Sequence, residues 1–139
     1  MSRSRLPARF AVVPAMVVGL LAAGSGIASA HVTASSADAA QGGEGKVTFR
    51  VPDESDTART VKIRVELPTK TPIASVSVLP VPGWTVKPTR VPLNPPVKTD
   101  DGDTITETVS VVEFDAAAGG GIAPGEFQEF ALSVGPLPK

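Results

Sequence analysis

The stretch KVTFRV, Lys46–Val51, decides the fold class of this chain. In it the apolar residues Val47, Phe49 and Val51 alternate with a lysine, a threonine and an arginine. The run TVKIRVEL at Thr60–Leu67 alternates in the same way. A period of two gives a segment one buried face and one hydrated face. That pattern is typical of a β-strand in a sheet that is covered on one side.

Three further runs extend this pattern along the chain, and we expect strands at Ile73–Pro80, Thr104–Phe114 and Gly125–Val134. In the second of these runs, a crowding of apolar residues indicates a bulge or a change of face at Val109, Val111 and Val112. In the third run, four apolar side chains are predicted to lie near one side of the strand: Phe127, Phe130, Leu132 and Val134.

Segments rich in proline and glycine separate the runs, among them VPDESDTA, LPTKTP, VPGW, NPP and AAAGGGIAPG. No window shows helical periodicity over enough residues to predict a helix. Many short strands joined by frequent turns are typical of an antiparallel β-sandwich. We therefore expect an all-β fold of immunoglobulin-like or cupredoxin-like architecture.

The acidic segment KTDDGDT contains Asp100, Asp101 and Asp103 and resembles a calcium loop at first sight. It lacks the later glutamate that an EF-hand loop places at a fixed spacing. An Asp-Gly pair also favours the positive φ angles of a tight hairpin. We therefore predict a hairpin turn here and no calcium site.

The first thirty residues have the order of a secretory signal peptide. Three arginines, at positions 3, 5 and 9, precede an apolar run that ends in the small-residue site Ala28-Ser29-Ala30. A membrane anchor is the alternative, but prolines and glycines interrupt the apolar run. We predict cleavage after Ala30, export out of the cytoplasm to the envelope, periplasm or medium, and one mature domain at residues 31–139.

Composition excludes several classes of function. The chain has 13 basic and 14 acidic residues, and three arginines belong to the predicted signal peptide, so the mature domain is mildly acidic. A mildly acidic domain without a basic cluster does not predict nucleic-acid binding. The chain has no cysteine, which excludes disulfides, thiolate metal sites and cysteine nucleophiles. It has one histidine, at the mature terminus, and we find no catalytic constellation; we expect no enzyme.

That histidine, His31, directly follows the predicted cleavage site. Cleavage would expose its α-amino group, which can chelate one metal ion together with the imidazole Nδ1. Two nitrogen donors in this arrangement favour Cu(II) among divalent first-row ions. The alternative is that His31 is only the first residue of a frayed terminus. A copper site here needs carboxylate, backbone or water ligands as well, and the nearest carboxylates in sequence are Asp38 and Glu44.

Long segments of the chain resemble the YcnI-like copper-binding family of exported bacterial proteins. The resemblance rests on the post-signal HVT, on FRVPDE, on PGW and on PGEFQEFALSVGPLP, and it covers nearly all of residues 31–139. It implies a β-sandwich that binds Cu(II) through an N-terminal brace made by one histidine, here His31. It also implies a carboxylate ligand from the loop before the second strand, where Glu44 stands, one residue before the expected position at Gly45.

The chain departs from the family pattern at its C-terminal end. The family pattern continues past GPLP with further strands and a tryptophan near the copper, whereas this chain stops at Lys139. We therefore expect a sandwich that lacks the family's last strands, in a fragment, a truncated product or a shortened member. The single tryptophan, Trp84, belongs to a different motif, and we predict that it packs in the core or at a corner.

The leading hypothesis from the sequence is an exported Cu(II) carrier or chaperone. It would pass the copper ion to a membrane copper importer or to another exported copper carrier. The first alternative is a structural or adhesive β-sandwich module at the cell surface, in which His31 is incidental. A copper-dependent oxidase is disfavoured because one tryptophan and no tyrosine offer little aromatic surface to a substrate.

Overall fold

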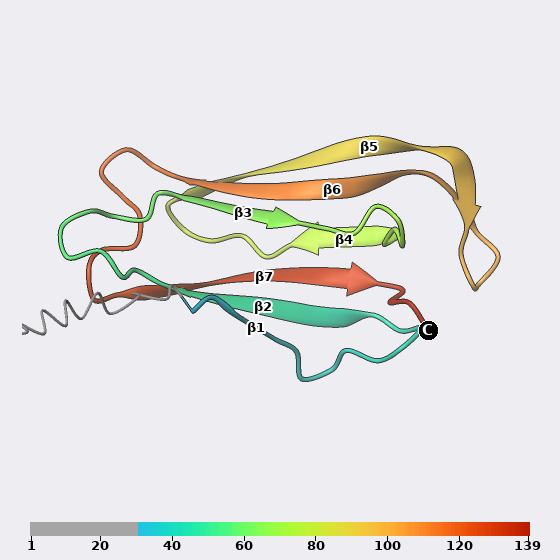
Figure 1. Cartoon of the computed structure of the whole chain (residues 1–139), viewed down its shortest axis with the longest axis horizontal. Coiled ribbons are helices and arrows are strands. Elements are labelled where there is room, and N and C mark those ends of the chain that lie inside the picture. Colours follow the sequence, from blue (N-terminus) through green and yellow to red (C-terminus); the bar gives the residue numbers. More distant parts are fainter. Residues whose placement is uncertain (1–30) are drawn as a thin grey trace, which may run out of the picture.

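The structure, a computed structural model, describes residues 31–139, so the predicted signal peptide at residues 1–30 lies outside the described residues. The described part is all β, and Figure 1 shows its strands running along the long axis of the molecule. The strands are β1 (Thr33–Ser35), β2 (Gly45–Pro52), β3 (Lys62–Glu66), β4 (Ser75–Val78), β5 (Trp84–Lys98), β6 (Thr104–Ala116) and β7 (Phe127–Gly135). The predicted all-β class is confirmed.

A four-stranded antiparallel sheet, in the order β1-β2-β7-β4, forms one layer. Strands β2 and β7 pair without interruption from Gly45 opposite Val134 to Pro52 opposite Phe127. The short strand β1 adds to the other side of β2, with Thr33 opposite Arg50 and Ser35 opposite Thr48. The alternation seen in KVTFRV follows from this position, because the inner face of β2 is covered and its outer face is hydrated.

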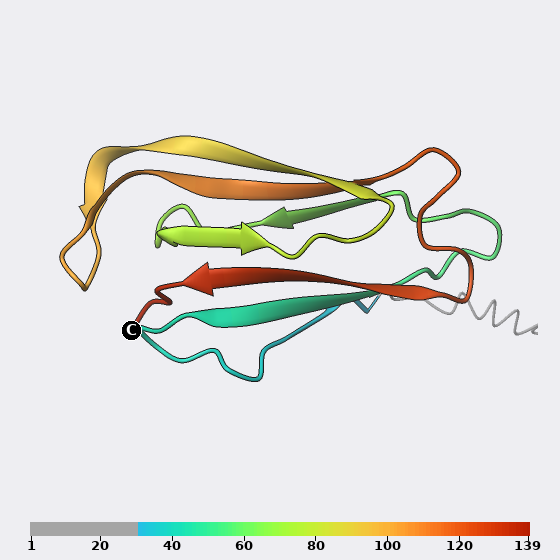
Figure 2. The same cartoon turned by 180° about the vertical axis from the view of Figure 1, so that it is seen from behind.

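The second layer is a three-stranded antiparallel sheet in the order β3-β6-β5. The bulge predicted in the valine-rich run is confirmed, because Thr89 pairs with Val111 while Arg90 pairs with Val109. Ser110 is therefore the extra residue, and its hydroxyl donates to the Thr89 carbonyl at 3.3 Å. A second register shift follows Pro92, where the β5–β6 hairpin bends over, as Figures 1 and 2 show.

Strand β5 is an element that the sequence analysis did not predict over its full length. It carries four prolines, at positions 88, 92, 95 and 96, and its NPP segment lies in the strand and not in the turn that its prolines predict. Proline has no backbone N–H and is tolerated in a strand only at an edge or a bulge. Because β5 pairs with β6 alone, its other side is the edge that can accommodate these residues.

The core lies between the two sheets and is centred on aromatic side chains. Phe130 of β7 and Phe114 of β6 have no exposed surface, and their ring centroids lie 4.8 Å apart. Trp84 is half-buried and meets the Phe130 ring edge to face at 5.0 Å, which confirms the predicted packing role of this tryptophan. Aromatic contacts of this geometry add to the stabilisation that burial alone supplies.

One prediction about β7 is wrong. Phe130, Leu132 and Val134 are buried as predicted, but Phe127 is 54% exposed. Phe127 lies opposite Pro52 on the outer face, and the Arg50 guanidinium stacks over its ring at 4.5 Å from the centroid. The reason is parity: residue 127 differs from residue 130 by three positions, and in a strand of period two these side chains point to opposite faces.

The acidic segment KTDDGDT forms the turn of the β5–β6 hairpin, as predicted. The Thr99 N–H donates to the Asp103 carbonyl at 2.8 Å, and the Gly102 N–H donates to the Thr99 carbonyl at 3.0 Å. Gly102 adopts a φ of 95°, a conformation that favours glycine. Within residues 31–139 no helix could span a membrane.

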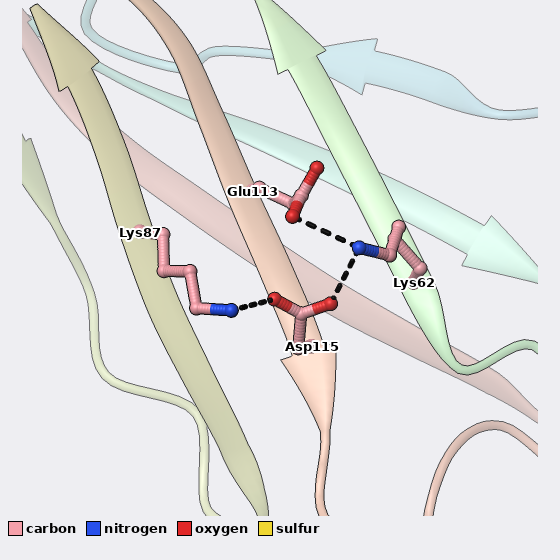
Figure 3. Close-up of polar contacts among 4 residues, drawn as sticks. All are labelled: Lys62, Lys87, Glu113 and Asp115. Atoms are coloured by element: carbon pink, nitrogen blue, oxygen red, sulfur yellow. Dashed lines mark hydrogen bonds and ion pairs between the residues drawn. The ribbon is translucent and has the colours of Figure 1, made fainter.

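Charged side chains line the outer face of the second sheet. Figure 3 shows the Lys62 ammonium between two carboxylates of β6, at 2.9 Å from Glu113 and 2.9 Å from Asp115, with Lys87 on the far side of Asp115 at 3.1 Å. The neighbouring ammonium groups of Lys62 and Lys87 lower the pKa of Asp115, and the carboxylates of Asp115 and Glu113 raise the pKa of Lys62. These contacts keep this face hydrated and polar.

The two phenylalanines of β7, one buried and one exposed, predict different losses of stability on substitution. We expect Phe130→Ala to lower the free energy of unfolding by about 3–5 kcal/mol, because it opens a cavity in the fully buried core. Phe127→Ala removes the same atoms from an exposed ring, so its loss should be much smaller. Urea unfolding of both variants measures the difference; equal losses would contradict the assigned core.

Candidate metal-binding terminus

The position of His31, the predicted first residue after cleavage, follows from the direction of β1. Strand β1 starts at Thr33 and runs antiparallel to β2, with Thr33 opposite Arg50. Continuing this register by two residues places His31 opposite Pro52, the last residue of β2. Residues that precede β1 therefore lie beside residues that follow β2, and the side chains of the loop after Pro52 are within reach of the terminus.

The residue that meets the terminus is Glu54. The His31 backbone nitrogen donates to the Glu54 Oε1 at 3.2 Å, and both residues are exposed. In the described chain this nitrogen belongs to the peptide bond after Ala30. If the chain is cleaved there, the same nitrogen becomes the α-amino group. The sequence analysis did not single out Glu54, although it lies in the quoted FRVPDE segment.

A buried neighbour fixes the loop that carries Glu54. Asp53 is only 7% exposed, and its carboxylate accepts three hydrogen bonds. The Ser55 N–H donates to one oxygen at 2.8 Å, and the Thr60 N–H and hydroxyl donate to the other at 2.7 and 2.8 Å. The Asp53 N–H in turn donates to the Glu126 carbonyl at 2.9 Å. The loop is thereby tied at both ends, and the residue between its ties, Glu54, has a defined position.

The protonation of Asp53 follows from these contacts. Burial disfavours the charged carboxylate, but the hydrogen bonds from Thr60 and Ser55 and the nearby Arg59 guanidinium together outweigh burial, and the pKa of Asp53 is lowered. The carboxylate is therefore ionised throughout the neutral range. Its hydrogen bonds are strongest in that charged form.

The structure does not bring Glu44, the predicted second ligand, to His31. Glu44 precedes β2 and packs at its opposite end, where a Cβ placed on Gly135 would lie 2.9 Å from the Glu44 Cα. Because β2 has eight residues, its two ends are about 23 Å apart at about 3.3 Å per residue. The physical reason is the antiparallel pairing of β1 and β2, which sets the end of β2, not its beginning, beside the terminus.

Asp38, the other carboxylate close to His31 in sequence, has a structural role in the β1–β2 connection. Its Oδ1 accepts the Lys46 N–H at 2.9 Å and the Ser36 hydroxyl at 3.2 Å. The hydrogen bond from Lys46 is the main cause of the lowered pKa of Asp38, and it outweighs the effect of burial. Asp38 therefore belongs to the connection that leads into β2 and not to the terminus.

His31 and Glu54 bring few potential metal donors together. Residues 31–139 contain no group of three or more histidine, aspartate or glutamate side chains that could hold a metal ion. A metal site in this part of the chain therefore depends on few side chains and on backbone donors. His31 and Glu54 would supply three donors from two residues: the amino nitrogen, the imidazole Nδ1 and a carboxylate oxygen.

An apolar groove of about 440 Å³ lies next to this terminus. Its walls are Val32, the inner-face residues Phe49 and Val51 of β2, and strand β3 from Lys62 to Glu66. Val32 directly follows His31 and is 52% exposed. An apolar groove and an exposed valine therefore lie directly beside His31.

Comparison with known proteins supports the fold and assigns no activity. Residues 31–139 match a family described as a domain of unknown function, DUF1775. An uncharacterized protein from Nocardia farcinica, whose crystal structure is described as an immunoglobulin-like fold, is 42% identical. The similarity covers 77% of this chain and 67% of that chain, with a TM-score of 0.59. No curated protein matches this chain.

The Asp53 contacts predict a pH-dependent stability. The folded-state pKa of Asp53 lies below the ordinary value of 3.8, so its contribution is present above that pH and is lost as the pH falls through the folded-state pKa. Asp53→Asn places an amide NH₂ against donors, so at pH 7 this variant should be less stable than the parent. The gap should narrow below about pH 3.8. Urea unfolding between pH 7 and pH 3 measures it.

Asp56→Asn is the matched control for this experiment, because Asp56 lies in the same loop and is exposed. Asp56 accepts none of the hydrogen bonds that hold this loop, so we expect Asp56→Asn to change the stability at pH 7 much less than Asp53→Asn does. A gap for Asp53→Asn that stayed constant from pH 7 to pH 3 would contradict the assigned role of the Asp53 carboxylate.

Proposed function

This chain belongs to the DUF1775 family, and we propose that it is an exported Cu(II)-binding protein whose metal site forms when the first thirty residues are removed. In this proposal the protein is a copper carrier or chaperone in copper uptake or homeostasis. It takes up the copper ion outside the cytoplasm and delivers it to a membrane copper importer or to another exported copper carrier.

The observation that carries the proposal is the 3.2 Å contact between the His31 nitrogen and the Glu54 carboxylate. The nitrogen that would become the α-amino group already has a carboxylate oxygen beside it, and the imidazole belongs to the same residue. Two nitrogen donors and one oxygen donor suit the tetragonal coordination that Cu(II) prefers. Glu54 therefore takes the place in this proposal that the sequence analysis gave to Glu44.

The donor set also predicts how protons compete with copper. An α-amino group has an ordinary pKa near 8, and it must lose its proton before it can bind a metal. Each bound copper ion therefore releases protons, and binding weakens as the solution is acidified. A protein that binds in this way holds copper at neutral pH and releases it more readily in acid.

Exposure of the site favours transfer over catalysis. His31 and Glu54 are both exposed, and two protein residues leave coordination positions for water or for an incoming ligand. An acceptor can therefore approach and exchange ligands stepwise, without a buried intermediate. The tethered loop around Asp53 holds Glu54 in place during this exchange.

A structural or adhesive module at the cell surface is the alternative function. The observation that favours it is the exposed Phe127 ring under the Arg50 guanidinium, which offers an apolar and cationic contact surface on the outer face of the first sheet. In that case the terminus has no role, and removal of copper changes nothing.

The test uses protein secreted by a host that cleaves the signal peptide, with His31 verified as the first residue by mass spectrometry. We expect one Cu(II) per chain and a nitrogen-rich EPR spectrum. Glu54→Gln should weaken binding by at least about tenfold, a loss seen even for groups that only orient a metal ligand. Glu44→Gln is the matched control and should bind like the parent.

A form with one extra alanine before His31 tests the amino group itself, because the α-amino nitrogen is then displaced from the imidazole. We expect this form to lose the nitrogen-rich spectrum while keeping its fold. Equal copper binding by the parent, the extended form and Glu54→Gln would overturn the proposed site. Absence of binding by the parent would favour the surface module.

A further inference from the structure

Strand β1 contributes no side chain to the core of the sandwich. Its three residues, Thr33–Ser35, are all exposed, and none of them belongs to the buried cluster or packs against it. Within residues 31–139, β1 pairs with β2 (Figure 1), and Val32 just before it is 52% exposed. Burial of apolar side chains is the main force that holds packed elements together. The docking of β1 therefore depends on its backbone pairing and on the contacts at its two ends.

The end of β1 that leads into the β1–β2 connection is anchored to the start of β2. The Asp38 carboxylate accepts the Lys46 N–H at 2.9 Å. The next residue, Ala39, lies directly against Gly45, where an added Cβ would come within 2.7 Å of the Ala39 Cα. A hydrogen bond to the backbone and a close backbone approach therefore hold the connection at this point, which is the end of β1 farther from His31.

The other end of β1 is held by the contact of the His31 nitrogen with the Glu54 carboxylate, at 3.2 Å. Both residues are exposed, so water competes for this hydrogen bond and its net contribution to stability is small. The loop that carries Glu54 is fixed by the buried Asp53, whereas every residue from 31 to 40 is exposed. The two ends of β1 are therefore secured unequally, and the His31 end is the weaker one.

We infer that β1 is a positioning strand for the proposed copper site and that Asp38 is its remote anchor. The inference rests on the proposed function, because it takes His31 and Glu54 as the copper ligands. A copper ion bound to both residues links the two ends of the segment 31–54 and fastens β1 to β2. By linkage, contacts that keep β1 docked strengthen copper binding, and bound copper strengthens the docking of β1 to the same extent.

This coupling gives the copper ion a route out of the site. Both nitrogen donors belong to His31 and move with β1, whereas Glu54 stays with the loop that Asp53 fixes. Lifting the start of β1 from β2 separates the nitrogen donors from the carboxylate and leaves the ion with an incomplete set of ligands. An acceptor then competes with part of the site instead of the whole site, so the docking of β1 controls how readily copper is transferred.

Asp38→Ala in the secreted protein tests the anchor at a distance from the metal. Asp38 bonds to Lys46, which lies six residues before Pro52 on β2, about 20 Å away at about 3.3 Å per residue. We expect one Cu(II) per chain and the parent's EPR spectrum, but binding at least about threefold weaker in competition with glycine, because losing the hydrogen bond lowers the docked fraction of β1. Asp38→Asn keeps an acceptor oxygen and should bind like the parent. Asp101→Ala removes the same charge from the exposed β5–β6 turn and is the matched control.

Hydrogen exchange of the secreted protein measures the docking of β1 itself. We expect the amides of Thr33–Ser35 to exchange more slowly with Cu(II) than in EDTA, and Asp38→Ala to speed their exchange in EDTA. The form with one extra alanine before His31 is the control and should show no effect of copper on these amides. Unchanged exchange in β1, or equal copper affinity of the parent and Asp38→Ala, overturns the coupling while the copper site stands. A parent that binds no copper overturns both.

Discussion

Antiparallel pairing of β1 with β2 is the constraint on which the candidate site depends. It makes the residues before β1 neighbours of the residues after β2, and this alone brings His31 to Glu54. The pairing is held in turn by the uninterrupted ladder between β2 and β7, whose inner face contributes Phe130 to the core. The segment at His31 is thus attached, through β2 and β7, to the buried core of the domain.

The loop after β2 combines a buried carboxylate with an exposed one. Asp53 accepts hydrogen bonds from both ends of the loop, whereas its neighbour Glu54 faces the terminus and solvent. In the proposed copper site this support would hold the Glu54 carboxylate in place while other coordination positions exchange. In the second layer, the outer face of the sheet is charged and its inner face is apolar.

The strands and their class could be predicted from the sequence because period-two alternation directly reflects one buried face. Strand β5 could not be predicted from the sequence, because its prolines are typical of turns. Its position at a sheet edge is what accommodates these prolines. Phe127 lies on the face opposite to the predicted one, because it is three residues from Phe130 and side chains three apart in a strand point to opposite faces. Of the candidate site, His31 could be predicted from the sequence, but Glu54 could not. Glu44 is closer in sequence, and only the antiparallel pairing of β1 with β2, which the folded chain reveals, brings Glu54 to His31.

The most direct test of the proposed copper site is a crystal structure of the secreted protein, beginning at His31, with Cu(II) bound. We predict one copper ion held by the amino nitrogen and the Nδ1 of His31 and by a carboxylate oxygen of Glu54, with the loop around Asp53 unchanged. Copper bound at Glu44 or elsewhere on the domain, with Glu54 turned away from His31, would contradict it.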